Sequence, residues 1–187
     1  SLDRDKVLEA VDAHAPSLLP YARLFLGRRS YYRYLGSDGE GEALPADQGV
    51  DQGDPLAPAF LAVTIRGPLE RLEARLRQFA AEEAVAETAD PEAAAEAAAD
   101  AIRVRAYLDD VLVRVPAHLA ARVPDEAAAA LAEVGGDLDT AKTQVWRAKD
   151  GCPPGCQAWW NPTGLVLLGG PLAGEDELTG GAALLGT

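Results

Sequence analysis

Two runs of alternating side chains meet at Leu108-Asp109-Asp110, and they constrain the fold more than any other part of the chain. Apolar residues alternate with arginine and tyrosine over residues 102–107, and valines alternate with leucine and arginine over residues 111–115. Alternation with a period of two is typical of β-strands. Aspartate suits the turn between them, because its short side chain can bond its own backbone. The pattern therefore predicts a β-hairpin with two carboxylates at its tip.

Asp109 and Asp110 repel each other in such a turn, and no base lies within the turn to offset this repulsion. A hard divalent cation such as Mg²⁺ would offset it, since Mg²⁺ is bound through one or two carboxylates together with substrate phosphates. A solvated acidic turn is the alternative, and these residues alone favour it. The choice between the two depends on the rest of the sequence.

A second motif, Gly49-Val50-Asp51-Gln52-Gly53-Asp54-Pro55-Leu56-Ala57-Pro58, precedes an apolar run over residues 59–65. Asp54 is a good helix N-cap, and Pro55 suits the first turn of the helix. Gln52 and Gly53 then lie just before a helix start, where free N–H groups favour anions. Gly53 has no side chain, so a ligand can approach its backbone closely. An ordinary glycine turn before a capped helix is the alternative.

With Tyr107-Leu108-Asp109-Asp110 downstream, this order of motifs resembles the palm of a reverse transcriptase of the non-LTR retroelement type. The family patterns are Q-G-x-P-L-S-P and Y-x-D-D. Residues 139–145 resemble the family's lysine motif, and residues 165–169 resemble the hydrophobic-Leu-Gly hairpin that grips the primer. The resemblance covers residues 2–177 apart from one insertion. Ala57 departs from it, because the family has Ser there, and so does Asp51, where Arg or Gln is frequent.

The resemblance implies an α+β fold, with a palm-like antiparallel sheet backed by helices and incomplete at the N-terminus. It implies an RNA-directed DNA polymerase with two Mg²⁺ ions, acting on an RNA or DNA template-primer and nucleotides. Asp109 would be the ligand of both ions and Asp110 the neighbouring acid. Tyr107 would support the primer end, and Lys142 would approach the triphosphate. Gln52 and Gly53 would line the path of nucleotide and template.

The family's other catalytic Asp lies in a strand with the pattern F-D-x-x-x-A-F, which this sequence does not contain. Asp3 and Asp5 lack the flanking aromatic residues and lie at an expected helix start. We therefore expect this chain to be inactive alone, as part of a longer reverse transcriptase. Two alternatives stay open: a degenerate, non-enzymatic binding or structural module, and an unrelated acidic α+β interaction domain.

The net charge of −13 argues against nucleic-acid binding, because affinity for phosphates comes largely from Lys and Arg. Residues 80–100 carry seven acids and no base, and removing them leaves −6. We expect this stretch to be an exposed, dispensable insertion, and we expect weak or no nucleic-acid binding by the chain alone. Two groups of bases are candidates for a template groove, namely Arg23, Arg28, Arg29 and Arg33, and separately Arg103, Arg105 and Lys142.

Further expectations concern the remaining segments. A helix is expected to break or kink at Gly67-Pro68, and residues 178–187 are expected to be a flexible tail after one domain over residues 1–177. The tyrosines within residues 30–35 could stack bases, although packing in a core or strand edge is the simpler interpretation. Cys152 and Cys156 are expected to be free thiols. No run of eighteen apolar residues is present, and we expect an intracellular protein, nuclear if it belongs to a eukaryotic element.

Overall fold

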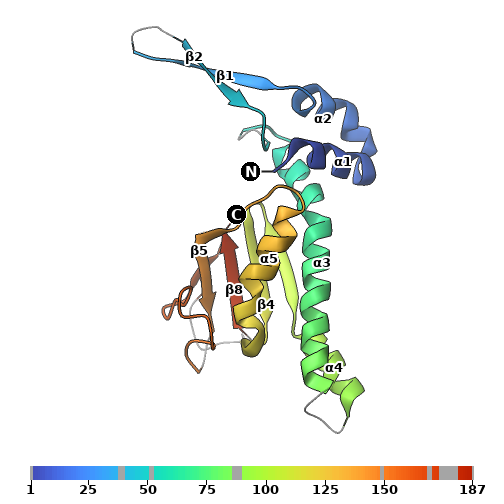
Figure 1. The fold of residues 1–187 in the computed structure, drawn as a ribbon, viewed down its shortest axis with the longest axis vertical. Coiled ribbons are helices and arrows are strands. Elements are labelled where there is room, and N and C mark those ends of the chain that lie inside the picture. The colour runs from blue at the N-terminus through green and yellow to red at the C-terminus, as the bar shows by residue number, and fades with distance from the viewer. Residues whose placement is uncertain are drawn as a thin grey trace. The chain divides into compact units, whose positions relative to one another are not determined.

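Short antiparallel sheets and helices alternate along the chain, so that the protein has a mixed α and β architecture (Figure 1). The computed structural model describes residues 2–37, 41–50, 53–85, 90–147, 150–167, 170–172 and 181–186. The chain forms two compact units. Unit 1 comprises Ser1–Gly67 with Val134–Gly136, and unit 2 comprises Pro68–Glu133 with Asp137–Thr187. No described helix has the length and apolar character needed to cross a membrane.

Unit 1 contains two short helices and a separate β-hairpin, followed by the beginning of a long helix. Its elements are α1 (Arg4–His14), a 3₁₀ turn (Pro16–Leu18), α2 (Leu19–Leu26), β1 (Ser30–Leu35), β2 (Gly41–Ala46) and the first part of α3 (Ala57–Val85). Asp3, at the expected helix start, caps α1, because its carboxylate accepts a hydrogen bond from the Asp5 N–H at 2.8 Å. The core consists of buried side chains from the helices, namely Val7, Val11, Ala22, Leu26 and Phe60.

Arg4 is a buried charge that joins three segments of unit 1. Its Nε donates to the Gly49 carbonyl at 3.0 Å, and its Nη1 donates to Ser30 Oγ at 3.3 Å. Ser30 Oγ donates in turn to the Ala46 carbonyl at 2.8 Å. Burial of a charged group is stable only when such hydrogen bonds compensate for lost hydration. Arg4 thereby fixes the base of the β1–β2 hairpin and the segment that leads into the Gln52-Gly53 motif.

Unit 2 contains a four-stranded antiparallel sheet in the order β3-β4-β8-β5. Its strands are β3 (Arg103–Tyr107), β4 (Asp110–Val115), β5 (Asp139–Trp146) and β8 (Gly181–Gly186). The remaining elements are α4 (Pro91–Asp100), a 3₁₀ segment (Ala117–Arg122), α5 (Val123–Ala132) and a small hairpin of β6 (Leu165–Leu167) and β7 (Gly170–Leu172). Helix α5 and the unit 2 part of α3 lie over one face of the sheet (Figure 1).

Alternating side chains of β3 and β4 form the buried face of this sheet, as the sequence predicts. Val104, Val111, Val113 and Val115 are all buried. Buried leucines of α3 and apolar residues of α5 complete the core, namely Leu69, Leu72, Leu76, Val123, Ala127 and Leu131. The Glu73 carboxylate on α3 accepts a hydrogen bond from the Val104 N–H at 2.7 Å. This bond satisfies a backbone donor on the outer edge of the sheet.

Helix α3 runs continuously through Pro68, so the predicted break at Gly67-Pro68 is wrong. A proline inside a helix removes one backbone hydrogen bond and is unfavourable locally. Buried Ile65 precedes Pro68, and buried Leu69 and Leu72 follow it. Packing on both sides therefore outweighs the local cost. The boundary between the two units nevertheless falls at this proline.

The acidic stretch over residues 80–100 differs in part from the expected insertion. Residues 80–85 belong to α3, and Ala80 is buried. Glu83 lies 3.4 Å from the Arg122 guanidinium and 3.3 Å from His118 Nε2. Helix α4 matches the expectation better, because its described side chains are exposed or half-buried and Asp90 caps it. The part of the acidic stretch that lies outside the core is therefore shorter than the composition indicates.

The expected flexible tail at residues 178–187 contains the central strand β8. This strand pairs antiparallel with β4 on one side and with β5 on the other. A sheet gains backbone hydrogen bonds on both edges of an inserted strand, and unpaired backbone groups are costly when buried. The sequence did not predict this strand, because residues 181–186 lack the β-branched and aromatic side chains that are typical of strands.

Two smaller expectations concern cysteines and tyrosines. Cys152 and Cys156 are free thiols as predicted, and burial raises the pKa of the Cys156 thiol, with the neighbouring Cys152 adding to the effect. Packing of the β1 tyrosines was expected, and this is wrong. Tyr31 and Tyr34 are each more than 60% exposed, because among the described strands β1 pairs only with β2.

Candidate functional site

The β3–β4 hairpin places the two predicted carboxylates at its tip. Tyr107 pairs directly with Asp110, so Leu108 and Asp109 form a two-residue loop. Asp109 is exposed, and Asp110 is half-buried as the first residue of β4. The geometric prediction of a hairpin at this sequence is therefore confirmed. The predicted catalytic and metal-binding roles of both residues stay predictions.

Leu108 adopts a left-handed backbone conformation, with φ at +54°. This conformation costs an L-residue about 1–2 kcal/mol, and two-residue hairpin loops favour Gly, Asn or Asp where φ is positive. Leu108 is also 46% exposed, and Tyr107 beside it is 60% exposed. Strained backbone persists where the surrounding structure or a function maintains it, and it is concentrated at active sites. The tip therefore combines strain, exposed apolar groups and two acids.

Strand register places Tyr107 and Asp110 on the open face of the sheet. Residues directly opposite each other in an antiparallel pair share a face, and neighbours along a strand alternate. Val111 faces the helices, so Asp110 and its partner Tyr107 face the other way. A ligand bound beside these side chains would meet the sheet on the side that the helices leave uncovered.

The same register brings Asp139 to this end of the sheet. Gly186 of β8 pairs with Asp110 on one side and with Asp139 on the other. Two strand spacings separate the acids, which corresponds to about 10 Å between their backbones. No role for Asp139 is predicted from the sequence, because pairing through a third strand leaves no signal in the local sequence.

Lys142 lies near the start of β5, where the pairing with β8 is irregular. Its Nζ is 3.4 Å from the Asp139 carboxylate, which also accepts hydrogen bonds from the N–H groups of Ala141 and Lys142. The Lys142 side chain is exposed. The structure thus places the predicted triphosphate-binding lysine at the end of the sheet where the β3–β4 hairpin turns, two strands away from Asp110.

The second predicted motif lies in unit 1. Gly53 has φ at +100°, and a Cβ added there would meet no atom within 4 Å. The Asp54 carboxylate accepts a hydrogen bond from the Leu56 N–H at 2.8 Å, and α3 begins at Ala57 rather than at Pro55. An accessible glycine before a helix is therefore present as predicted, but Asp54 lies three residues before the first residue of α3 and stabilises the preceding turn, so its predicted role as the helix N-cap is wrong. Gln52 lies outside the described residues.

The donor set at the β3–β4 hairpin suits a hard cation but is incomplete. Carboxylate oxygens are the ligands that Mg²⁺ prefers, and Asp109 and Asp110 supply them from one turn. Among the described residues, no three acidic, histidine or cysteine side chains come together as metal ligands. These residues therefore fit part of a magnesium site, and a further carboxylate is needed to bridge two ions.

The two predicted bases on β3, together with Arg114 of β4, donate hydrogen bonds to backbone carbonyls of unit 2. Arg103 Nη1 donates to the Ile102 carbonyl at 2.6 Å, and Arg105 Nη1 donates to the Val104 carbonyl at 2.9 Å. Arg114 Nε donates to the Ala101 carbonyl at 3.0 Å. These bonds stabilise the connection between α4 and β3. The bases of the other candidate group, by contrast, are all exposed on unit 1, namely Arg23, Arg28, Arg29 and Arg33.

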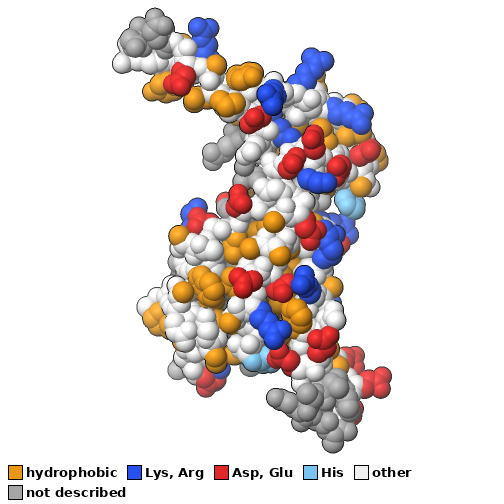
Figure 2. All heavy atoms as spheres, in the orientation of Figure 1, with side chains coloured by type: hydrophobic (Ala, Val, Ile, Leu, Met, Phe, Trp, Pro, Cys, Tyr) orange, Lys and Arg blue, Asp and Glu red, His pale blue; other side chains and the backbone are white. Residues whose placement is uncertain are grey.

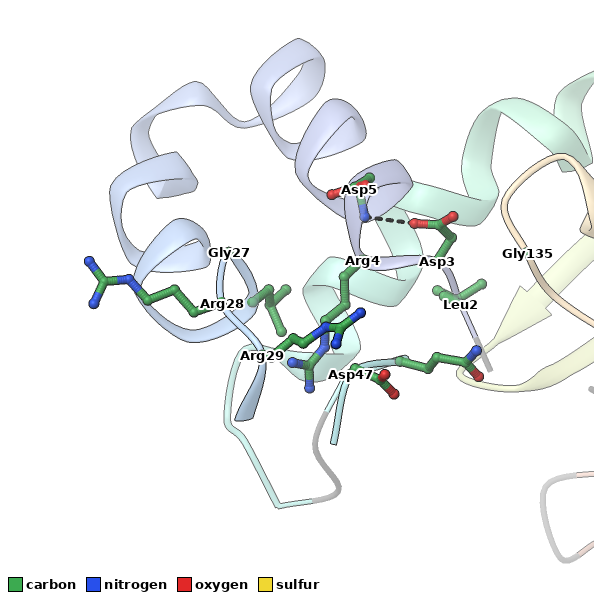
Figure 3. Close-up of a pocket in the computed structure, with 11 residues that line it drawn as sticks. Leu2, Asp3, Arg4, Asp5, Gly27, Arg28, Arg29, Asp47 and Gly135 are labelled. Atoms are coloured by element: carbon green, nitrogen blue, oxygen red, sulfur yellow. Dashed lines mark hydrogen bonds between the residues drawn. The ribbon is translucent and has the colours of Figure 1, made fainter. Parts of the chain in front are cut away.

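A cavity of about 460 Å³ is lined by residues of unit 1. Figure 3 shows Arg4 and Arg29 reaching into it, whereas Arg28 points away. Its charged lining consists of three arginines and three aspartates, namely Arg4, Arg28, Arg29, Asp3, Asp5 and Asp47. Because these charges balance, the cavity has no preference of its own for an anion.

Neither a family model, nor a curated protein, nor a solved structure matches this chain.

Proposed function

We propose that this chain contributes the palm of a reverse transcriptase, which adds nucleotides to a primer end as an RNA template directs. The observation that carries the proposal is the β3–β4 hairpin. It presents Asp109 and Asp110 beside Tyr107 at a strained, exposed turn. The Gln52-Gly53 motif precedes this hairpin in the order that the resemblance requires. A palm-like arrangement is supported by an antiparallel sheet with helices on one face.

Nucleotide transfer is an in-line displacement at phosphorus in which negative charge accumulates. Asp109 and Asp110 would hold Mg²⁺, which neutralises this charge and activates the primer hydroxyl. Tyr107 would support the primer end from the open face of the sheet. Lys142 would give up its pairing with Asp139 to contact the triphosphate and to protonate the departing pyrophosphate.

The missing carboxylate has a definite place in this proposal. Gly186 of β8 lies opposite both Asp110 and Asp139 and contributes no side chain. We infer that a strand carrying the F-D-x-x-x-A-F pattern takes the position of β8 in the complete enzyme. Its Asp would then stand beside Asp110, about 5 Å away across the strand spacing. Two strands would thus supply the carboxylates that two ions need.

One observation favours the alternative of a non-catalytic module. Strand β8 pairs along both β4 and β5, so the sheet of unit 2 is complete without a second acidic strand. A degenerate descendant that binds or supports another molecule would be expected to have such a complete sheet without a second acidic strand. The two candidates predict different effects of an added Asp strand. The polymerase should gain the ability to extend a primer, whereas the non-catalytic module should not.

Primer extension on an RNA template, with Mg²⁺ and all four nucleotides, tests the proposal. The chain alone is compared with a chain extended at its N-terminus by an F-D-x-x-x-A-F strand. We expect extension only by the longer chain, and we expect Asp109→Asn to reduce it by roughly 100-fold or more, because a charged ligand is lost. Asp12→Asn, which removes an exposed acid from α1, is the matched control and leaves the rate unchanged.

Two results would contradict the proposal in different ways. Primer extension by the unextended chain, if Asp109→Asn abolishes it, would show that no further strand is needed. Absence of extension by the longer chain, with its fold intact by circular dichroism, would favour the non-catalytic module.

A further inference from the structure

The β1–β2 hairpin exposes planar and basic side chains that the proposed polymerase site does not use. The segment from Arg23 to Leu35 contains four arginines, three tyrosines and no acid, in a chain of net charge −13. All four arginines and all three tyrosines are exposed. Figure 2 shows hydrophobic side chains along this hairpin. A two-stranded hairpin is only marginally stable by itself. Large aromatic side chains exposed on such a hairpin indicate a surface that binds another molecule.

The two faces of this hairpin differ in charge. Tyr31, Arg33 and Leu35 share one face, and their cross-strand partners are the uncharged Pro45, Ala43 and Gly41. Tyr32 and Tyr34 share the other face, where Tyr34 pairs with the acidic Glu42. The face of Tyr31, Arg33 and Leu35, called the Tyr31 face below, is therefore free of acids among the described residues.

Arg33 lies flat on the Tyr31 face. A Cβ at Gly41 would come within 2.6 Å of Arg33 Nε, so the guanidinium crosses the glycine backbone closely. Alternate residues of a strand are about 7 Å apart. This spacing allows one nucleobase to stack on the Tyr31 ring and a second nucleobase to stack on the Arg33 guanidinium. Bases stack on aromatic rings and on guanidinium planes, whatever their sequence. Arg28 and Arg29 immediately precede this strand and can contact phosphates.

We propose that the Tyr31 face binds single-stranded nucleic acid, with bases stacked on Tyr31 and Arg33 and phosphates contacted by Arg28 and Arg29. The proposal goes beyond the polymerase site, because it needs neither Asp109 nor a metal ion. Unpaired strands are favoured over duplexes, since only unpaired bases expose their planar faces. The remaining acidity of the chain limits affinity, so binding is strongest at low salt.

Fluorescence anisotropy of a labelled oligouridine, measured in EDTA at low salt, tests this proposal. We expect Tyr31→Ala to weaken binding by about tenfold, because one stacked base is lost. Tyr31→Phe keeps the planar ring and should retain the affinity. Tyr34→Ala removes an equally exposed tyrosine from the opposite face, beside Glu42, and is the matched control with little effect.

The arginines are tested by salt dependence. Replacing Arg28 and Arg29 by Gln should reduce the slope of log affinity against log salt by about 0.7 for each lost phosphate contact. Chelation of divalent ions by EDTA should leave the affinity unchanged, which separates this proposal from the metal-dependent polymerase site. Equal losses from Tyr31→Ala and Tyr34→Ala, or equal binding to duplex, would refute stacking on the Tyr31 face. Concentration-dependent self-association that Tyr31→Ala abolishes, without binding to oligouridine, would show instead that the face joins two copies of the chain.

Discussion

At the scale of single residues, Leu108 carries the clearest sign that the hairpin tip is specialised. Its φ of +54° places a bulky side chain where glycine is usual, and nearly half of that side chain is exposed. Burial of Leu108 therefore does not explain its presence. Because strain and two adjacent acids occur in one turn, the tip is better suited to a ligand than to stability.

Leu108→Gly should therefore stabilise the protein. Glycine relieves a left-handed strain of about 1 kcal/mol, which corresponds to a rise in Tm of about 2–4 °C in a chain of this size. Thermal unfolding followed by circular dichroism measures the change. Leu35→Gly is the control, because Leu35 is exposed in a strand with negative φ and its loss should lower Tm. A lower Tm for Leu108→Gly would show that Leu108 contributes packing that outweighs the strain.

At the scale of elements, the end of α3 and helix α4 have different roles, although the composition of residues 80–100 is nearly uniform. Ala80 is buried against the core of unit 2, and Glu83 pairs with Arg122. Helix α4 contributes mainly its C-terminal carbonyls, which accept hydrogen bonds from Arg114. The dispensable part is therefore shorter than the acidic stretch.

Replacing residues 86–97 by a short Gly-Ser linker should change Tm by no more than about 2 °C, because the described side chains of this segment are exposed or half-buried and such residues contribute little to stability. Ala80→Asp should instead lower Tm by roughly 10 °C, since it buries an unpaired carboxylate in the core. Differential scanning calorimetry of both variants gives the comparison. A large loss from the deletion would mean that α4 packs more firmly than its exposure indicates.

At the scale of the whole molecule, the sheet of unit 2 joins segments that are far apart in the sequence. Strand β8 lies between β4 and β5, and Gly186 stands between Asp110 and Asp139. A carboxylate at this position would adjoin Asp110 on the open face. Three acids would then surround one end of the sheet.

Gly186→Asp should create a divalent cation site with Asp110 and Asp109. We expect Mn²⁺ or Mg²⁺ to bind roughly tenfold more tightly than to the unmodified chain, because one further charged ligand is worth about 1–2 kcal/mol. Isothermal titration calorimetry measures the affinity. Ala182→Asp adds the same charge to the same face at the other end of β8, opposite Arg114, and is the control. Equal affinities for the two variants would place Gly186 away from the carboxylates.

Patterns between near neighbours in the sequence predicted the local structure well. Alternation over residues 102–115 predicted β3, β4 and the acidic turn between them, and the expected helix start at Asp3 is the capped start of α1. These features depend on side-chain period and on hydrogen bonds within a few residues, which the sequence displays directly. The same rules failed at Pro68, where packing of residues on both sides outweighs a local helix breaker.

By itself, the sequence determined where the two acids lie and that a turn between two strands carries them. Only the tertiary structure decided that β8 completes the sheet, that Asp139 lies across Gly186 from Asp110, and that the tyrosines of β1 are exposed. The reason is physical. Turns and caps are stabilised by neighbouring residues, whereas strand pairing and burial depend on contacts between distant segments, whose partners no local pattern specifies.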